Sequence, residues 1–286
     1  MVIRKLFTVS ILLMFAMTSG AADTLRIHLT FKYKLDTAGH SIGKMVVNQK
    51  VHTPGGILFR EISFDENSGQ LTGYVFYFYR NGRLFTVEYY NQSDSLIYIL
   101  RHEYDQDGNE VSITKLGPGK QGLLPMERTI RIFDKNQRLM QQKQYFGKKA
   151  GVLTTYQYNP NGYLKEETCK TKPPAILSYR EEIRSYSYNV ENSLIQMFVN
   201  GRDLMGKSYQ YREEYNYDDK GRLSAVKVFG PGNELTGTRV YQYLTGKDLG
   251  RYEERDSRGK THVLFEYEDK EYYMEPGTQV SRYEGF

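Results

Sequence analysis

The sequence predicts an all-β protein in which tandem antiparallel β-hairpins form one long, twisted and curved meander sheet. The chain has 26 Tyr and 14 Phe but no Trp, and such rings suit a half-buried pleated surface. Apolar and polar residues alternate with period two along much of the chain, and helical spacing of apolar residues is absent after the first segment. Turn signals also recur at regular intervals, which predicts repeated hairpins.

Residues 1–22 have the pattern of a signal peptide. Two basic residues precede an apolar run from Leu6 to Met17, which is shorter than the roughly 20 apolar residues of a membrane-spanning helix. We expect cleavage after Ala21 or Ala22, which leaves one repeat domain over residues 23–286 and no transmembrane helix. The predicted location is the periplasm, the cell surface or the surroundings of a Gram-negative bacterium.

Composition excludes some functions and limits what can stabilise the fold. The net charge of +5 is too small to indicate nucleic acid as a partner. Cys169 is the only cysteine, so no intramolecular disulfide can form even in an oxidising compartment. We therefore expect packing between neighbouring repeats and backbone pairing to stabilise the protein.

The repeat begins with an aromatic residue followed by Asp or Asn, and continues through a turn, usually with Gly, to an apolar residue. Its clearest copy runs from Tyr215 to Leu223 and reads YNYDDKGRL. The period is roughly 25 to 30 residues. A second turn in each unit predicts two strands per unit, and Asn81-Gly82 predicts one additional hairpin. Other copies begin at Tyr104, Phe133, Tyr158 and Tyr188, with weaker ones at Tyr33 and Phe64.

This unit resembles the core of the YD-repeat family, also called Rhs repeats, which reads roughly as Gly, a spacer, then Tyr-x-Tyr-Asp-x-x-Gly-Arg-Leu. Gly206 to Leu223 match that core almost in full, and the looser copies cover residues 60–270. The resemblance implies a secreted or cell-surface protein with a long curved sheet, and family members often bind carbohydrate or enclose a toxin. Because the repeats run nearly to Phe286, we expect a short array without a C-terminal toxin domain.

Two glycine-rich stretches match nucleotide-binding patterns in letters but not in context. Residues 201–208 read GRDLMGKS, like a phosphate-binding loop, yet residues 209–217 alternate like a strand where that loop needs a helix. Residues 117–122 fit the dinucleotide fingerprint, but Pro125 and the lack of a following helix argue against it. We interpret both stretches as turns and expect no cofactor.

Adjacent glutamates recur in the chain, and glycoside hydrolysis uses two carboxylates. Neighbours on a strand point to opposite faces, however, so an adjacent pair cannot act on one bond. We expect cross-strand Arg–Glu ladders on a solvated face, and no catalytic residues. The pairs are Glu166-Glu167, Glu181-Glu182, Glu213-Glu214 and Glu253-Glu254.

Histidines and the single cysteine are the other candidates for chemistry. His28, His40 and His52 are evenly spaced, so a hairpin could bring two of them together. They have no cysteine or acidic cluster nearby, and we predict no metal site. Cys169 lies on an alternating strand without a nearby histidine, which favours a packed residue over a nucleophile.

The tyrosines are the feature most suggestive of function, because rows of exposed rings can stack on sugars or accept peptide strands. The candidate ligand-binding face consists of Tyr209, Tyr211, Tyr215 and Tyr217. The leading hypothesis is an exported, non-catalytic binding or structural protein of the bacterial envelope whose partner is a glycan or an envelope protein.

Two alternatives remain open. An outer-membrane β-barrel would explain many alternating strands, although a strand such as Met140 to Tyr145 is polar for lipid. A glycan-active enzyme would need carboxylates from different strands to converge. An open meander also exposes edge strands, and the first strand, Leu25 to Leu35, has basic residues that would protect an edge: Arg26, His28, Lys32 and Lys34.

Overall fold

The computed structural model describes residues 23–35, 39–53, 55–65, 68–120, 122–173, 175, 179–243 and 249–274. The predicted signal peptide, residues 1–22, lies outside this part of the chain. Within it, the chain forms strands of a single 18-stranded sheet. None of the described segments is a helix long and apolar enough to cross a membrane.

The strands follow one another with short turns. In chain order they are β1 (Asp23–Leu35), β2 (Ser41–His52), β3 (Leu58–Phe64), β4 (Leu71–Arg80), β5 (Arg83–Asn91), β6 (Leu96–Tyr104), β7 (Glu110–Gly119), β8 (Gly122–Phe133), β9 (Leu139–Phe146), β10 (Lys149–Tyr158), β11 (Leu164–Thr171), β12 (Tyr179–Tyr188), β13 (Leu194–Asp203), β14 (Ser208–Tyr217), β15 (Leu223–Phe229), β16 (Leu235–Tyr243), β17 (Leu249–Asp256) and β18 (Thr261–Met274).

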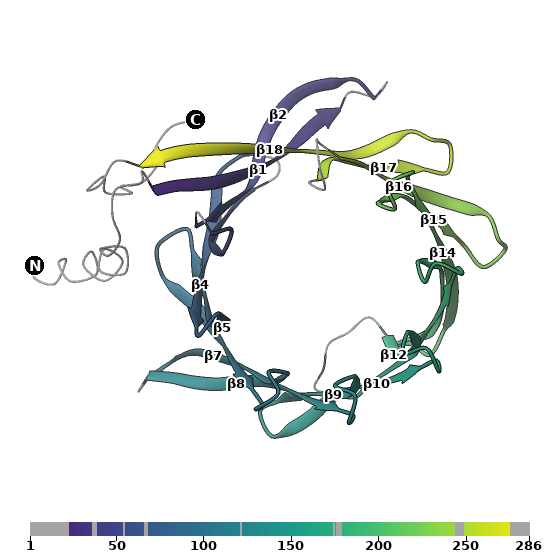
Figure 1. Cartoon of the computed structure of the whole chain (residues 1–286), viewed down its shortest axis with the longest axis horizontal. Coiled ribbons are helices and arrows are strands. Elements are labelled where there is room, and N and C mark those ends of the chain that lie inside the picture. Colours follow the sequence, from purple (N-terminus) through teal and green to yellow (C-terminus); the bar gives the residue numbers. More distant parts are fainter. Residues whose placement is uncertain are drawn as a thin grey trace, which may run out of the picture.

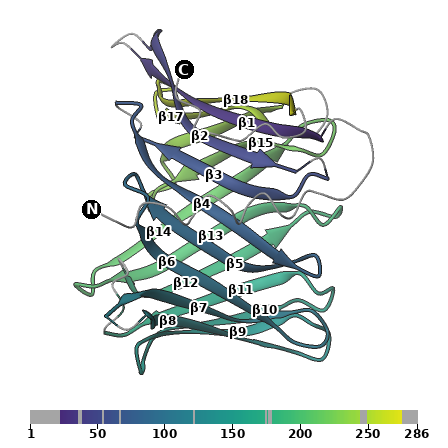
Figure 2. The same ribbon diagram turned by 90° about the vertical axis from the view of Figure 1, so that its left-hand side faces the viewer.

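The sheet is a closed barrel. Each strand pairs antiparallel with its neighbours in the chain, and β1 also pairs with β18, where Asp23 lies opposite Met274. Figure 1 shows the resulting ring, and Figure 2 shows the strands inclined around it. The expected open meander is therefore wrong, because the first and last strands pair and leave no edge. Arg26, His28 and Lys32 belong to a strand that is paired on both sides, so they do not protect an edge.

The predicted turns that lie within the described residues are confirmed, and an Asp or Asn of the repeat closes the first turn of its unit. At the β14–β15 turn, Asp218 Oδ1 accepts hydrogen bonds from the backbone N–H groups of Lys220, at 3.0 Å, and Arg222, at 2.8 Å. Gly221 adopts a φ of 73°, which glycine tolerates without strain. Asn81, at a φ of 52°, and Gly82, at 72°, likewise form the two-residue turn between β4 and β5.

In five hairpins, a tyrosine at the leading position of the repeat connects its hairpin to the preceding one. Its hydroxyl donates a hydrogen bond to the backbone carbonyl of the leucine that ends the preceding turn, so the Tyr, Asp and Leu of the repeat each have a structural role. The bonds are Tyr104 to Leu84, 2.8 Å; Tyr158 to Leu139, 2.8 Å; Tyr188 to Leu164, 2.9 Å; Tyr217 to Leu194, 2.7 Å; and Tyr243 to Leu223, 2.8 Å.

The two faces of the barrel differ in how crowded their side chains are. Residues paired across the strands share a face, and closing a sheet leaves less room on its concave side. On β5 to β16, one face holds most of the buried side chains, and we assign it to the inside of the barrel. This inner face includes Val87, His102, Val152, Thr154, Cys169, Glu182, Val199, Glu213 and Val226, whereas the outer face of these strands buries Ser112 and Leu116.

The barrel is too wide for its side chains to fill it, as in other barrels of 16 to 18 strands. The inner-face side chains of Arg184 and Arg239 remain 36% and 39% exposed. The buried apolar cluster of the described residues lies instead on the outer face of β1 and β2, and comprises Ile27, Leu29, Phe31 and Val51.

Candidate functional site

The four candidate tyrosines lie on the inner face of β14 and come from alternate positions of that strand. Tyr209 donates to Glu182 Oε2 at 2.6 Å, and Tyr215 donates to Glu213 Oε2 at 2.8 Å. Tyr217 donates to the Leu194 carbonyl. Three of the four hydroxyls are thus bonded within the barrel wall, which gives them a structural role. Ligand binding by this face stays a prediction.

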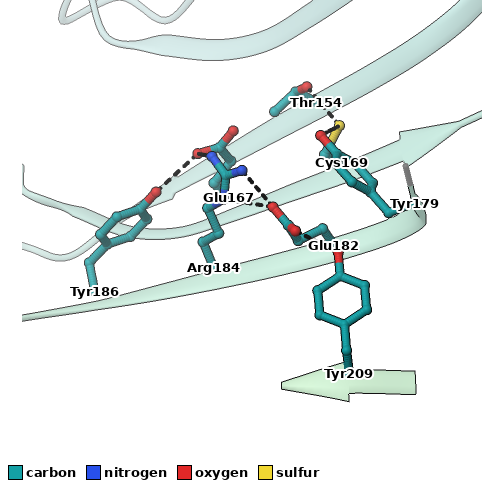
Figure 3. Close-up of polar contacts among 8 residues, drawn as sticks. All are labelled: Thr154, Glu167, Cys169, Tyr179, Glu182, Arg184, Tyr186 and Tyr209. Carbon is teal, nitrogen blue, oxygen red and sulfur yellow. Dashed lines mark hydrogen bonds and ion pairs between the residues drawn. The ribbon is translucent and has the colours of Figure 1, made fainter. Parts of the chain in front are cut away.

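An ionic network that includes Tyr209 links β11, β12 and β14 (Figure 3). Arg184 on β12 donates from Nε to Glu182 Oε1 at 2.7 Å, and its Nη1 lies 3.7 Å from Glu167 Oε2 on β11. Tyr186 donates to the same Glu167 oxygen at 3.0 Å. Glu182 is only 6% exposed, so its negative charge depends on these donors.

The pKa shifts in this network agree with its geometry. Burial, and then the neighbouring carboxylates, raise the pKa values of Tyr186 and Tyr209, so both stay protonated donors. Burial alone would lower the pKa of Arg184, but Glu182 and Glu167 outweigh it and raise that pKa. The network is therefore a fixed set of donors and acceptors at neutral pH.

Adjacent glutamates point to opposite faces of the sheet, as predicted. Glu213 faces inward and accepts from Arg239 at 3.0 Å, while Glu214 pairs with Arg212 on the outer face at 3.0 Å. Glu181 similarly pairs with Lys170 on the outer face. The expected ladders on one solvated face are thus divided between both faces, and the inward carboxylates of Glu182 and Glu213 are buried.

A histidine site that sequence reasoning missed lies on the inner face of β6. Nδ1 of His102 is hydrogen-bonded to Glu110, whose other carboxylate oxygen contacts Arg131. Nε2 of His102 is buried and has no partner within the described part of the chain. Burial, and then Arg131, lower the pKa of His102, which favours the neutral imidazole. No sequence spacing indicates this group, because its members come from three strands.

Two of the three evenly spaced histidines meet, as their spacing allowed. The rings of His28 on β1 and His52 on β2 lie edge to face with centroids 4.9 Å apart, whereas His40 lies just before β2. Burial, and then the charge of His28, lower the pKa of His52. Among the described residues, no group of three or more His, Cys, Asp or Glu could hold a metal ion.

The remaining sequence candidates are structural. Cys169 is buried, 3.5 Å from Thr154 Oγ1 and 3.6 Å from the Tyr179 hydroxyl (Figure 3), as expected for a packed residue. The GRDLMGKS stretch is the turn between β13 and β14, and Gly206 takes a φ of 85° there. The second glycine-rich stretch is part of the β7–β8 hairpin.

Comparison with known proteins shows only distant likeness in fold. No protein-family model matches the chain, and no curated protein matches it in sequence. A TcdB2–TccC3–Cdc42 structure has 11% identity to this chain and a TM-score of 0.32. The match covers 83% of this chain but only 18% of that chain.

A porin-like protein from Bacteroides uniformis has 10% identity and a TM-score of 0.41, with 86% of this chain and 97% of that chain covered. A porin-like protein from Bacteroides vulgatus has 9% identity and a TM-score of 0.38, with 84% and 96% covered. At these scores the chain shares only a distant likeness in fold with these structures, and the likeness carries no argument on function.

Proposed function

We propose that this chain is an exported, non-catalytic binding protein of the bacterial envelope that has water on both faces of its barrel and binds a glycan. The observation that carries the proposal is that both faces of the closed sheet bear ion pairs. On β14 alone, Glu213 pairs inward with Arg239 and Glu214 pairs outward with Arg212. Charges on both faces are expected of a barrel that is wetted inside and outside.

The outer face is costly to place in lipid. An Arg or Lys on the lipid face costs about 2–4 kcal/mol at the bilayer midplane, and outer-face ion pairs recur around the barrel. They include Arg128 with Glu103, Lys170 with Glu181, Arg212 with Glu214, and Arg251 with Glu253. This distribution supports a barrel surrounded by water.

A glycan is the ligand class that the inner face favours. Sugars are bound by flat aromatic rings beside fixed hydrogen-bonding groups, and the wide barrel leaves its inner side chains partly exposed. Tyr89 and Tyr98 stack on the inner face with centroids 4.2 Å apart, and Lys115 Nζ lies 4.5 Å from the Tyr98 ring centroid. Fixed donors and aromatic rings thus occur together on this face.

The test is co-sedimentation of the purified processed protein with insoluble cell-wall and dietary polysaccharides. Tyr98→Ala removes an inner-face ring and is expected to weaken binding about fivefold, since one stacking contact contributes on the order of 1 kcal/mol. Tyr74→Ala is the matched control, because Tyr74 stacks on Tyr90 at 5.2 Å on the outer face. Absence of binding to every polysaccharide by the folded protein would reject glycan binding and direct the search to envelope proteins.

A second candidate is an outer-membrane barrel, which closure of the sheet favours because lipid tolerates no unpaired edge. The outer face of β1 also carries the apolar row Ile27, Leu29 and Phe31. This candidate predicts ion conductance when the purified protein is added to a planar lipid bilayer. Reproducible channels would favour the outer-membrane barrel over the barrel surrounded by water, and their absence would favour the barrel surrounded by water.

We also infer that the repeats are related to YD repeats. The Tyr–Asp–Gly–Leu order of the repeat corresponds to a tyrosine bond, an Asx-closed turn and a leucine carbonyl that recur from hairpin to hairpin. The recurrence of this unit along the chain, with the residue order of the YD core, supports the inferred relation.

A further inference from the structure

A pocket of about 360 Å³ is lined mainly by outer-face residues and also by Tyr211 of β14. It is formed by β13, β14 and the turn that connects β15 with β16. Its size suits one or two sugar units, since small-molecule pockets begin at roughly 300 Å³. The lining includes Gln196, Phe198, Gln210, Arg212, Pro231 and Asn233.

The pocket combines one aromatic ring with several polar groups. Phe198 is 40% exposed and lies opposite Arg212 across the β13–β14 pairing, so a ring and a guanidinium border the same space. The side-chain amides of Gln196 and Asn233 can both donate and accept hydrogen bonds. An apolar flat surface beside amides is the arrangement that recognises a sugar ring and its hydroxyls.

Arg212 gives the pocket its charge preference. Its guanidinium lies over the Phe229 ring at 4.4 Å, which fixes its position. Its Nη2 atom is 3.0 Å from Glu214 Oε1, whereas Nε has no partner within the described part of the chain. Outside the lining, the charge of Lys227, which lies opposite Glu214 in the β14–β15 register, is offset by Glu234, whose carboxylate lies beside Gly230. Arg212 is the charged side chain among the residues that line the pocket. A guanidinium in the lining favours a ligand that carries a carboxylate.

We propose that this pocket binds a sugar residue that carries a carboxylate, such as a uronic acid unit of a polysaccharide. The sugar ring lies against Phe198, the carboxylate pairs with the guanidinium of Arg212, and the amides of Gln196 and Asn233 bond the hydroxyls. This site shares Tyr211 with the inner tyrosine face and shares the class of ligand with the proposed function, but it does not include Tyr89 or Tyr98.

Isothermal titration of the full processed protein with a trigalacturonate, and with its methyl ester, tests the proposal. The two probes have the same sugar units, but the ester has no carboxylate charges, so the wild-type protein is expected to bind the acid at least tenfold more tightly. Arg212→Gln is expected to abolish that preference, and Arg212→Lys to keep part of it. Phe198→Ala is expected to weaken binding of both probes.

Matched controls make the same changes elsewhere on the outer face. Phe78→Ala alters a ring with 41% exposure, close to the 40% of Phe198, and Arg128→Gln removes an arginine that pairs with Glu103. Both controls are expected to leave the acid preference unchanged. Thermal melting of each variant checks that it is folded.

Equal binding of acid and ester by the wild-type protein, or an acid preference that survives Arg212→Gln, would overturn the site. If one of these results is found but polysaccharide binding depends on Tyr98, the pocket is rejected and the proposed function is retained. Failure of every polysaccharide and of both trisaccharides would reject the two together.

Discussion

At the residue scale, the tyrosines that define the repeat act through their hydroxyls as much as through their rings. The sequence predicted that Tyr209, Tyr211, Tyr215 and Tyr217 would form a binding face. The structure places all four on the inner face of β14 and bonds three of the hydroxyls within the barrel wall. Sequence periodicity could group these residues but could not reveal partners on other strands, such as Glu182 for Tyr209 and Leu194 for Tyr217.

Tyr217→Phe tests the structural role of the hydroxyl. The change removes only the donor to the Leu194 carbonyl, a bond of 2.7 Å, and is expected to lower the free energy of unfolding by about 1 kcal/mol. Chemical denaturation measures the difference. Tyr211→Phe is the control, because no hydrogen bond of the Tyr211 hydroxyl is found among the described residues; an equal loss in both variants would contradict this role.

The turn aspartates are expected to make the free energy of unfolding depend on pH in the acid range. Backbone N–H groups, first that of Arg222, lower the pKa of Asp218 below its ordinary value of 3.8, and bonds from Arg138 do the same for Asp134. A carboxyl whose pKa is lower in the folded state stabilises it above the unfolded pKa and loses that contribution as pH falls through the folded pKa.

We therefore expect the urea midpoint to fall as pH is lowered from about 5 to about 2.5. Asp218→Asn keeps an acceptor oxygen but does not titrate, so its midpoint should depend less on pH over this range. A variant with the same pH dependence as the wild-type protein would show that Asp218 does not contribute to it.

At the element scale, the hairpin is the unit that the sequence predicts best. The Asp or Asn, the glycine and the following leucine mark each turn because each is required by local geometry. The copies that begin at Phe133 and Tyr188 form the same turn without glycine: Gln137 takes a φ of 61° and Asn192 a φ of 63° where other repeats have glycine. Strand and turn positions were therefore predictable from local chemistry.

Exchanging residues between equivalent turns tests this explanation. Gly221→Ala places a Cβ at a φ of 73° and is expected to destabilise the protein by roughly 1 kcal/mol. Gln137→Gly relieves the corresponding strain and is expected to stabilise it slightly. Thermal unfolding compares the two, and a shift in the same direction for both would contradict the argument.

At the scale of the whole molecule, closure of the barrel was not predictable from the repeat. Alternation of apolar and polar residues is the same in an open and in a closed sheet, and the pairing of β1 with β18 joins segments from the two ends of the chain. The inner ionic networks were missed for the same reason. His102, Glu110 and Arg131 come from β6, β7 and β8, and their contact depends on register.

A designed disulfide tests closure directly. Thr30 and Tyr267 lie opposite each other in the β1–β18 pairing, so Thr30→Cys with Tyr267→Cys, in a Cys169→Ser background, should form an intramolecular bond on mild oxidation. Faster migration on a non-reducing gel detects it. Thr30→Cys with Thr155→Cys is the control, and an open sheet would leave both double variants unlinked.

The most direct test of a water-wetted barrel is fractionation of the full-length chain expressed in a Gram-negative host, followed by gel filtration without detergent. The ion pairs on both faces predict a processed protein in the periplasmic or extracellular fraction that stays monodisperse in buffer alone. Recovery only in the outer-membrane fraction, with detergent needed to keep the protein in solution, would contradict this account.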